Sequence, residues 1–454
     1  MKWVRRGANV LILLVAANYF PLCTVCPAKV GDAFWFAALA AFVCVNVWPK
    51  ARSEPTRRIR WLASGAELLG LFLVSAAATV VMQAGFLWKL LSLLTPGEDG
   101  FGNGIVVMCC IFSVLQAVLL EAVLFWNGMI RVYLTSVQLG LKHRVLAALC
   151  GWIPFVNIWY LAKIIRIVSE EAEFETEKWE LDAVRAEDGI CRTKYPLLLV
   201  HGVFFRDYRY VNYWGRIPRE LMRNGAVIYY GQQQSAGAVE DSGRELAARI
   251  RQIVEETGCG KVNIIAHSKG GLDSRAAIAH AGCAPCVATL TTINTPHRGC
   301  IFAEYLLGKV PEAARQNIAA AYNAAMKRLG DENPDFLAAV TDLTESACLA
   351  RNETTPDAPG VVYESVMSYC RKARHGKFPL NMTYPIVKHF DGKNDGLVSV
   401  ESARWGSRFT LLEPEGRRGI SHGDVVDLNR ENIRDFDVRE FYVNLTADLK
   451  RRGY

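Results

Sequence analysis

Long apolar segments fill the first third of this 454-residue chain and constrain its fold more than any other feature. A helix needs about 20 mainly apolar residues to cross the hydrocarbon core of a bilayer. Four segments approach that length, and a fifth, which contains Pro154 and Asn157, could either cross or re-enter. The segments cover residues 8–25, 33–48, 61–94, 105–126 and 145–162. We therefore expect residues 1–168 to form a membrane domain of four to five transmembrane helices.

The positive charge of the chain also lies in this first third. Residues 1–168 contain 15 Lys/Arg and six Asp/Glu, whereas the remainder carries a net charge of −2. Basic residues gathered between apolar segments indicate membrane topology, and no motif for nucleic-acid binding accompanies them. The cations at Lys2, Arg5 and Arg6 and in residues 49–60 predict that these regions are cytoplasmic. Four crossings would leave the rest of the chain in the cytoplasm, but we expect five, which places it outside.

Two acidic residues and the cysteines are possible functional sites. Glu67 and Glu121 lie within apolar segments, where an ionised side chain is costly and often functional. No matching set of charges accompanies them, so we prefer an anchor with interhelical hydrogen bonds over a transport pathway. The 13 cysteines show no disulfide spacing. Cys283 and Cys286 form one CxxC pair without further ligands, which argues against zinc.

A charged stretch, residues 169–190, predicts a linker helix, and a second domain follows over residues 191–454. In that domain, continuous apolar runs alternate with amphipathic stretches, which predicts a mostly parallel sheet with helices on both faces. The expected strands are residues 195–200, 226–231, 261–267, 287–294 and 384–390. The expected helices are residues 216–223, 241–257 and 271–281. Ligands of such sheets bind at the carboxyl ends of the strands.

Ser268 stands at one of these strand ends, in the sequence Ala266-His-Ser-Lys-Gly270. This matches the nucleophile elbow, with alanine at the first glycine position. The elbow holds its serine in a strained conformation, so that small neighbours are needed where strand and helix pass closely. A serine that only caps a helix is the alternative interpretation.

Other loops favour the catalytic interpretation. His201 and Gly202 end the first strand, so the backbone N–H groups of Val203 and Lys269 could together stabilise an oxyanion. Asp395 follows the last expected strand and His422 precedes the last helix, which gives the chain order of the α/β hydrolases. In that arrangement the histidine takes the proton of the serine and the aspartate orients the histidine.

Several residues compete for these roles. Asp391 and Asp424 are alternatives to Asp395, and His389 is an alternative to His422 that falls inside an expected strand. Three further histidines of this domain are expected to be structural: His201, His280 and His297.

The blocks "YPLLLVHGVFFRD", "KVNIIAHSKGGLDSR", "TLTTINTPHRG" and "NDGLVSVESARWG", in this order, resemble those of the bacterial secreted true lipases, the triacylglycerol lipases, over residues 195–449. The resemblance implies an α/β-hydrolase fold, hydrolysis of carboxylic esters without a cofactor, and a mobile helical lid at about residues 301–379. It also implies a structural calcium ion with Asp424 as a ligand, although another expected ligand position holds Leu428. Ala266, Lys269 and the membrane domain depart from the pattern.

Together these features predict a membrane-anchored lipase or esterase that forms an acyl-enzyme on Ser268. Its expected partners are an acyl lipid or ester substrate and the lipid bilayer, and nucleic acid is not expected. The sequence identifies no protein partner. Two alternatives stay open: an acyltransferase that uses the same triad, and a membrane interaction or sensor protein on a silent hydrolase scaffold.

Overall fold

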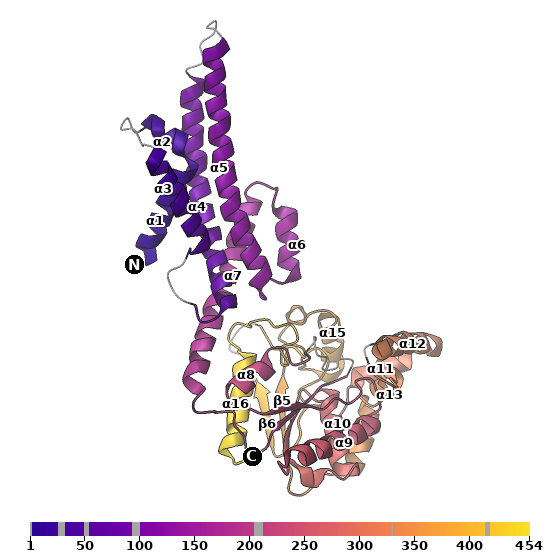
Figure 1. Cartoon of the computed structure of the whole chain (residues 1–454). Coiled ribbons are helices and arrows are strands. Elements are labelled where there is room, and N and C mark those ends of the chain that lie inside the picture. The colour runs from indigo at the N-terminus through magenta and orange to yellow at the C-terminus, as the bar shows by residue number, and fades with distance from the viewer. Residues whose placement is uncertain are drawn as a thin grey trace. The chain divides into compact units, whose positions relative to one another are not determined.

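The structure of the chain is a computed structural model, which describes residues 2–25, 32–49, 54–92, 100–203, 212–328, 330–413 and 418–454. The chain divides into two compact units, an N-terminal unit Met1–Leu181 and a C-terminal unit Asp182–Tyr454. The N-terminal unit is built of helices, and the C-terminal unit combines a sheet with helices (Figure 1).

Two long antiparallel helices form the centre of the N-terminal unit, as Figure 1 shows for α4 and α5. Their pairing is fixed by contacts such as Ser75 with Glu121 and Ser113 with Gln83. A side chain on Gly128 would begin 2.8 Å from the Leu69 side chain, so the glycine permits the close approach. The helices starting in this unit are α1 Lys2–Ala17, α2 Tyr19–Val25, α3 Asp32–Val47, α4 Arg57–Leu91, α5 Gly100–Thr135, α6 Gly140–Cys150 and α7 Val156–Arg185.

Two of the described helices are long and apolar enough to cross a bilayer, Arg57–Leu91 and Gly104–Thr135, and Phe34–Val47 is a shorter apolar helix. In the most apolar stretch of α5, only 11% of the residues are buried within the protein. The outward-facing side chains of α5 include Met108, Phe112, Leu115, Leu119 and Trp126. The surface of this helix is therefore apolar over most of its length.

The fifth apolar segment, residues 145–162, is not one helix. α6 ends at Cys150, turns occupy residues 151–155, and α7 begins at Val156. Pro154 lies in this break, where the absence of an N–H group does no harm, and Phe155 takes a positive φ of 64°. The 11 residues of α6 span about 16 Å, about half of a hydrocarbon core. Residues 145–162 therefore do not form one continuous helix, and the fifth crossing expected above stays a prediction.

Six parallel strands form the sheet of the C-terminal unit, in the order β2-β1-β3-β4-β5-β6. The four strands expected between residues 195 and 294 are confirmed, as are the three expected helices. The strands are β1 Leu197–Val200, β2 Ile228–Tyr230, β3 Val262–His267, β4 Val287–Ile293, β5 Val362–Ser368 and β6 Arg408–Leu412.

The expected strand at residues 384–390 was wrong, because these residues belong to helix α15, Leu380–Asp391. A short apolar run does not distinguish a strand from a helix, and here the buried residues Tyr384 and Val387 follow helical spacing. The fifth strand is β5, which lies inside the range expected for the lid. The insertion between β4 and β5 consists of α11 Ile301–Lys309, α12 Glu312–Arg328, α13 Phe336–Thr341 and α14 Glu345–Thr354.

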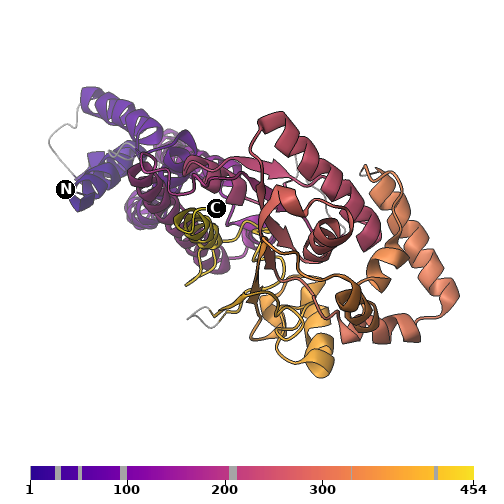
Figure 2. The same ribbon diagram turned by 90° about the horizontal axis from the view of Figure 1, so that it is seen from below.

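Helices cover both faces of the sheet, because successive side chains of a strand point to opposite faces. Leu197 and Leu199 of β1 pack in one core with α8, Ile217–Arg223, and α16, Val438–Arg451. Leu198 and Val200 pack in the other with α9, Val239–Thr257, and α10, Lys269–His280. In Figure 2 the insertion helices extend from one side of this layered unit.

Candidate active site

Ser268 joins the end of β3 to the start of α10 with an unusual backbone conformation, φ 56° and ψ −131°. A residue with a side chain pays a steric penalty in this region, so the surrounding structure must hold it there. The Ser268 N–H donates to the Ile293 carbonyl at 2.9 Å. A Cβ atom on Gly270 would lie 2.3 Å from the His201 carbonyl oxygen, which excludes any side chain at that position. Close packing therefore requires a residue without a side chain at Gly270, as expected for a nucleophile elbow.

Asp395 and His422 form a buried pair. The His422 Nδ1 atom lies 2.6 Å from Asp395 Oδ2, and the Asp395 side chain is fully buried. Asp395 also accepts hydrogen bonds from the Asn294 side chain at 2.6 Å and from the N–H groups of Leu397 and Val398 at 2.8 Å each. Because the Asp395 carboxylate accepts a hydrogen bond from His422 Nδ1, the proton of the neutral imidazole is held on that atom. His422 Nε2 is then the atom that can act as a base.

Ser268 and His422 line the same pocket, which has a volume of about 600 Å³. Most of the other lining side chains are apolar, and many come from α11, α12 and α13, among them Leu306, Ile318 and Leu337. Within the described residues, the Ser268 hydroxyl forms no hydrogen bond, either with His422 or with another group. Catalytic hydrogen bonds commonly tighten only when substrate is bound. The pocket can accept an extended apolar group next to Ser268 and His422, and the Asp395 carboxylate lies behind the histidine.

The two expected oxyanion donors lie beside Ser268. Val203 lines the pocket, and Lys269 is the first residue of α10, where an N–H group has no acceptor within its own helix. A Cβ atom on Gly202 would lie 2.8 Å from the Ser268 Cβ, so the chain before Val203 passes close to the serine. The "FFRDYRYV" part of the loop, residues 204–211, is outside the described residues.

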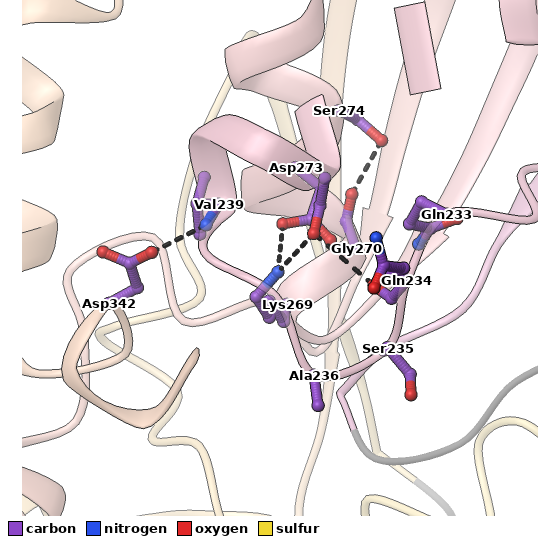
Figure 3. Close-up of polar contacts among 12 residues, drawn as sticks. Gln233, Gln234, Ser235, Ala236, Val239, Lys269, Gly270, Asp273, Ser274 and Asp342 are labelled. Atoms are coloured by element: carbon purple, nitrogen blue, oxygen red, sulfur yellow. Dashed lines mark hydrogen bonds and ion pairs between the residues drawn. The ribbon is translucent and has the colours of Figure 1, made fainter. Parts of the chain in front are cut away.

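The Lys269 side chain is buried, points toward Asp273 (Figure 3), and is not among the residues that line the pocket. Its ammonium group donates to Asp273 Oδ1 at 2.6 Å and to Ser242 Oγ at 3.2 Å. Burial raises the pKa of Asp273 to about 6, and the charge of Lys269 opposes that rise. Beside this pair, Asp342 of the insertion accepts from the Val239 N–H at 2.7 Å. Only the backbone of Lys269 is therefore available to a substrate.

Sequence reasoning missed a tyrosine and a histidine that support His422. The Tyr213 hydroxyl lies 2.5 Å from His267 Nδ1, and the rings of His267 and His422 are 4.4 Å apart. Burial, and then the proximity of His422, hold the pKa of His267 well below its usual value. His267 is thus neutral and does not repel a protonated His422. Its position just before the elbow serine was the only signal in the sequence, whereas nothing in the sequence indicated Tyr213.

The competing residues lie elsewhere. Asp391 ends α15, and its Oδ2 atom is buried without a partner among the described residues. His389 is in the same helix. Three other histidines make structural contacts: His201 with the Gln233 carbonyl, His280 with Glu240, and His297 by stacking on Trp405.

The expected calcium ligand, Asp424, is engaged by a cation of the protein itself. Its carboxylate accepts from Arg418 at 3.1 and 3.2 Å and from the Ser421 N–H at 3.0 Å. Arg418 also contacts Glu431 at 3.1 Å, and Leu428 lines the pocket. Calcium needs six to eight oxygen ligands, and the described residues contain no cluster of three or more side chains suited to a metal. These residues do not fit calcium, so the expected site is not supported.

Comparisons with known proteins show which families this chain resembles. Residues 198–325 match a family described as "Putative serine esterase (DUF676)". The chain is 35% identical to a triacylglycerol lipase of Burkholderia plantarii over 39% of this chain and 52% of that protein, so it spans about half of that relative's length. A crystal structure of the Staphylococcus hyicus lipase aligns with 57% of this chain and 96% of its own, at 18% identity and a TM-score of 0.45.

A triacylglycerol lipase of Pseudomonas fragi is matched almost completely. The two sequences are 30% identical over 299 residues, which are 59% of this chain and 99% of that protein. By this match the chain belongs to the triacylglycerol lipase family.

Proposed function

We propose that this protein is a membrane-anchored serine hydrolase that cleaves carboxylic esters of acyl lipids. The observation that carries the proposal is the strained serine, Ser268, in an apolar pocket that His422 also lines, with Asp395 buried behind His422 and paired to its Nδ1 atom. A helix-capping serine needs no such conformation, no such pocket and no histidine. A silent scaffold would have no reason to keep the three groups together.

The reaction follows from the roles that these groups can take. Ser268 Oγ attacks the ester carbonyl while His422 Nε2 takes its proton, and Asp395 stabilises the resulting imidazolium. The N–H groups of Val203 and Lys269 stabilise the tetrahedral oxyanion. The intermediate then expels the alcohol, which receives the proton from His422, and leaves an acyl group on Ser268. Water, deprotonated by His422, releases the free acid by the reverse sequence, and no cofactor is needed.

The pocket lining supports an acyl chain as the bound group. Its walls come largely from the insertion helices α11, α12 and α13, and apolar side chains there would otherwise face water. Part of the insertion is fixed, because Asp331 accepts from the N–H groups of Ser235 and Ala236 at 3.1 Å each. The movable part of a lid would therefore be α11 and α12, a shorter segment than residues 301–379.

Membrane anchoring is supported by the exposed apolar surface of α5 and by the lengths of α4 and α5.

The contacts of Glu171 in α7 indicate on which side of the membrane the chain leaves the helical unit. This buried carboxylate accepts from Arg58, at the start of α4, and from Ser136, directly after α5. The chain thus leaves this unit at the end where the basic residues 57–60 enter it. Basic residues favour the cytoplasmic side, so we propose a cytoplasmic hydrolase unit instead of the expected external one.

A direct test is labelling of membranes with a fluorophosphonate, together with hydrolysis of a series of esters of increasing acyl length. The wild type should be labelled and should release free acid, whereas Ser268→Ala should lose both and still accumulate in the membrane. Addition of alcohol acceptors would reveal acyl transfer as new ester product. Equal labelling of Ser268→Ala and the wild type would refute the assignment of the nucleophile.

A further inference from the structure

One side of the pocket is formed by the chain that leads from β5 into α15. Lys377, Phe378, Pro379 and Leu380 all line the pocket. Exposed residues lie before and after them, among them Lys372, Arg374 and Met382, so this segment can contact a surface that the pocket faces. We call residues 371–386 the rim segment.

The rim segment carries positive charge that is only partly compensated. Arg371, Lys372 and Arg374 are exposed, and no Asp or Glu occurs in residues 371–390. Lys372 and Arg374 form no ion pair with any residue that the structure describes. Two nearby carboxylates pair with cations other than Lys372 and Arg374. Glu413 pairs with Lys393, and Glu431 pairs with Arg418 and with Lys377 of the rim segment.

His375 lies among these cations. Its pKa lies below the usual value, first because the ring is partly buried and then because Arg374, Arg418, Lys372 and Arg371 surround it. The Gly419 N–H donates to His375 Nδ1 at 3.2 Å, which keeps the proton off that atom. Four cations close enough to affect one imidazole form a local patch rather than a scatter of surface charge.

Large apolar side chains stand beside these cations. Phe378 is 78% exposed, and Met382 is 61% exposed. Met382 and Ile386 are four residues apart on α15 and therefore share one face of that helix. Nucleic acid or an acidic protein surface would account for the cations but not for exposed apolar groups at the same place. An anionic bilayer accounts for both, because its phosphates attract cations while its interior accepts apolar side chains.

We propose that the rim segment docks on an anionic lipid bilayer and thereby presents the mouth of the Ser268 pocket to ester-bearing lipids. The docking itself stands on the charge and exposure of the segment, and its consequence for substrate rests on the proposed hydrolase function. Lys372 and Arg374 are attracted to the anionic lipid head groups, and the side chains of Phe378 and Met382 insert into the apolar part of the bilayer. Each cation near an anionic surface strengthens the attraction by about fivefold.

The test uses the full chain in nanodiscs of neutral phosphatidylcholine or of the same lipid mixed with anionic phosphatidylglycerol. Each disc contains a fluorogenic lipid ester, and a short soluble ester is assayed in parallel. The wild type should cleave the embedded ester at least about fivefold faster in the anionic discs, and high salt should remove the difference. The soluble ester should be cleaved equally in both.

Charge-reversal variants identify the surface. Lys372→Glu with Arg374→Glu should lose the preference for anionic discs and keep the rate on the soluble ester. The matched control is Arg244→Glu with Arg251→Glu on α9, two exposed residues on a helix distant from α15 in the same unit (Figure 1), and it should retain the preference. Equal wild-type rates in both discs, or equal losses in both variants, would overturn the docking proposal. Failure of the wild type on the soluble ester would instead overturn the hydrolase function.

Discussion

At the scale of single residues, the Asp395 carboxylate is held by more contacts than any rival acid near the pocket. Three donors and His422 surround it. Among the residues that the structure describes, Asp391 neither bonds to His422 nor lines the pocket, and Asp424 is paired with Arg418. This explains physically why only one carboxylate can orient the histidine. A carboxylate that orients an imidazole ring must itself be held in one orientation.

We therefore expect Asp395→Asn to lower kcat by about 10⁴-fold, because an amide at this position favours the wrong imidazole tautomer. His422→Ala should cost about as much as Ser268→Ala, since the members of a triad act as a unit. Asp391→Asn is the control and should stay close to wild type. The measurement is kcat on a soluble ester, and the acid role would move to Asp391 if the two asparagine variants behaved in the opposite way.

A second prediction at this scale concerns the buried pair of Lys269 and Asp273. Lys269→Met leaves the Asp273 carboxylate buried without its partner, which should lower the free energy of unfolding by about 3–5 kcal/mol. Lys269→Met combined with Asp273→Leu removes both charges and should recover most of that loss. Unfolding of the purified protein in detergent would measure both variants.

The same double variant separates the side chain of Lys269 from its backbone. If Lys269 acts on the substrate only through its N–H group, the double variant should hydrolyse soluble ester within a few-fold of wild type. A loss as large as that of Ser268→Ala, in a protein that remains folded, would contradict this role.

At the scale of elements, the insertion helix α12 decides how the pocket is covered. Ile318 and Tyr322 lie one turn apart, line the pocket, and are 48% and 37% exposed. Such partly exposed apolar side chains are poorly satisfied in water and would be stabilised by contact with an acyl chain or a lipid surface.

Ile318→Asn should therefore reduce hydrolysis of long-chain esters several-fold and leave short, soluble esters almost unaffected. Ala321→Asn, an exposed position of the same helix that does not line the pocket, is the matched control. The wild type should also act faster on aggregated ester than on the same ester as monomers. Equal rates on the two forms would indicate an open pocket without a lid.

At the scale of the whole molecule, the proposed cytoplasmic location of the hydrolase unit can be tested with intact cells. Lysine reagents suit this test better than thiol reagents, because most cysteines of the unit are buried. Burial raises the pKa of both Cys191 and Cys283 to about 12, so these thiols should be unreactive. Exposed lysines of the unit include Lys309, Lys327 and Lys388.

A membrane-impermeant lysine reagent should leave these lysines unmodified in intact cells and modify them after lysis, as read by mass spectrometry. An added lysine-bearing periplasmic or extracellular marker would confirm that the reagent reached the outer face. Modification in intact cells would place the hydrolase unit outside and would require another crossing of the membrane.

The sequence by itself determined those features that are written in contiguous residues. Strands β1 to β4 and the elbow at Ser268 could be predicted because apolar runs, small residues and turn residues adjoin one another there. Strand β5 and helix α15 could not be predicted, because a short apolar run can form either a strand or a helix, and the elements that pack against it decide between the two. β5 becomes a strand by pairing with β4 and β6, and α15 becomes a helix by burying Val387.

Only the tertiary structure decided which distant groups meet. The chain order of Ser268, Asp395 and His422 was visible in the sequence, but three aspartates were available to one histidine. The choice depends on where the loops after α15 and β6 close over the carboxyl ends of the strands, and on Asn294, which reaches Asp395 across 101 positions of the chain. Likewise, Arg418 reaches Asp424 and Glu431 only once that loop is folded. Such contacts are set by packing of the whole unit, which no local stretch of sequence encodes.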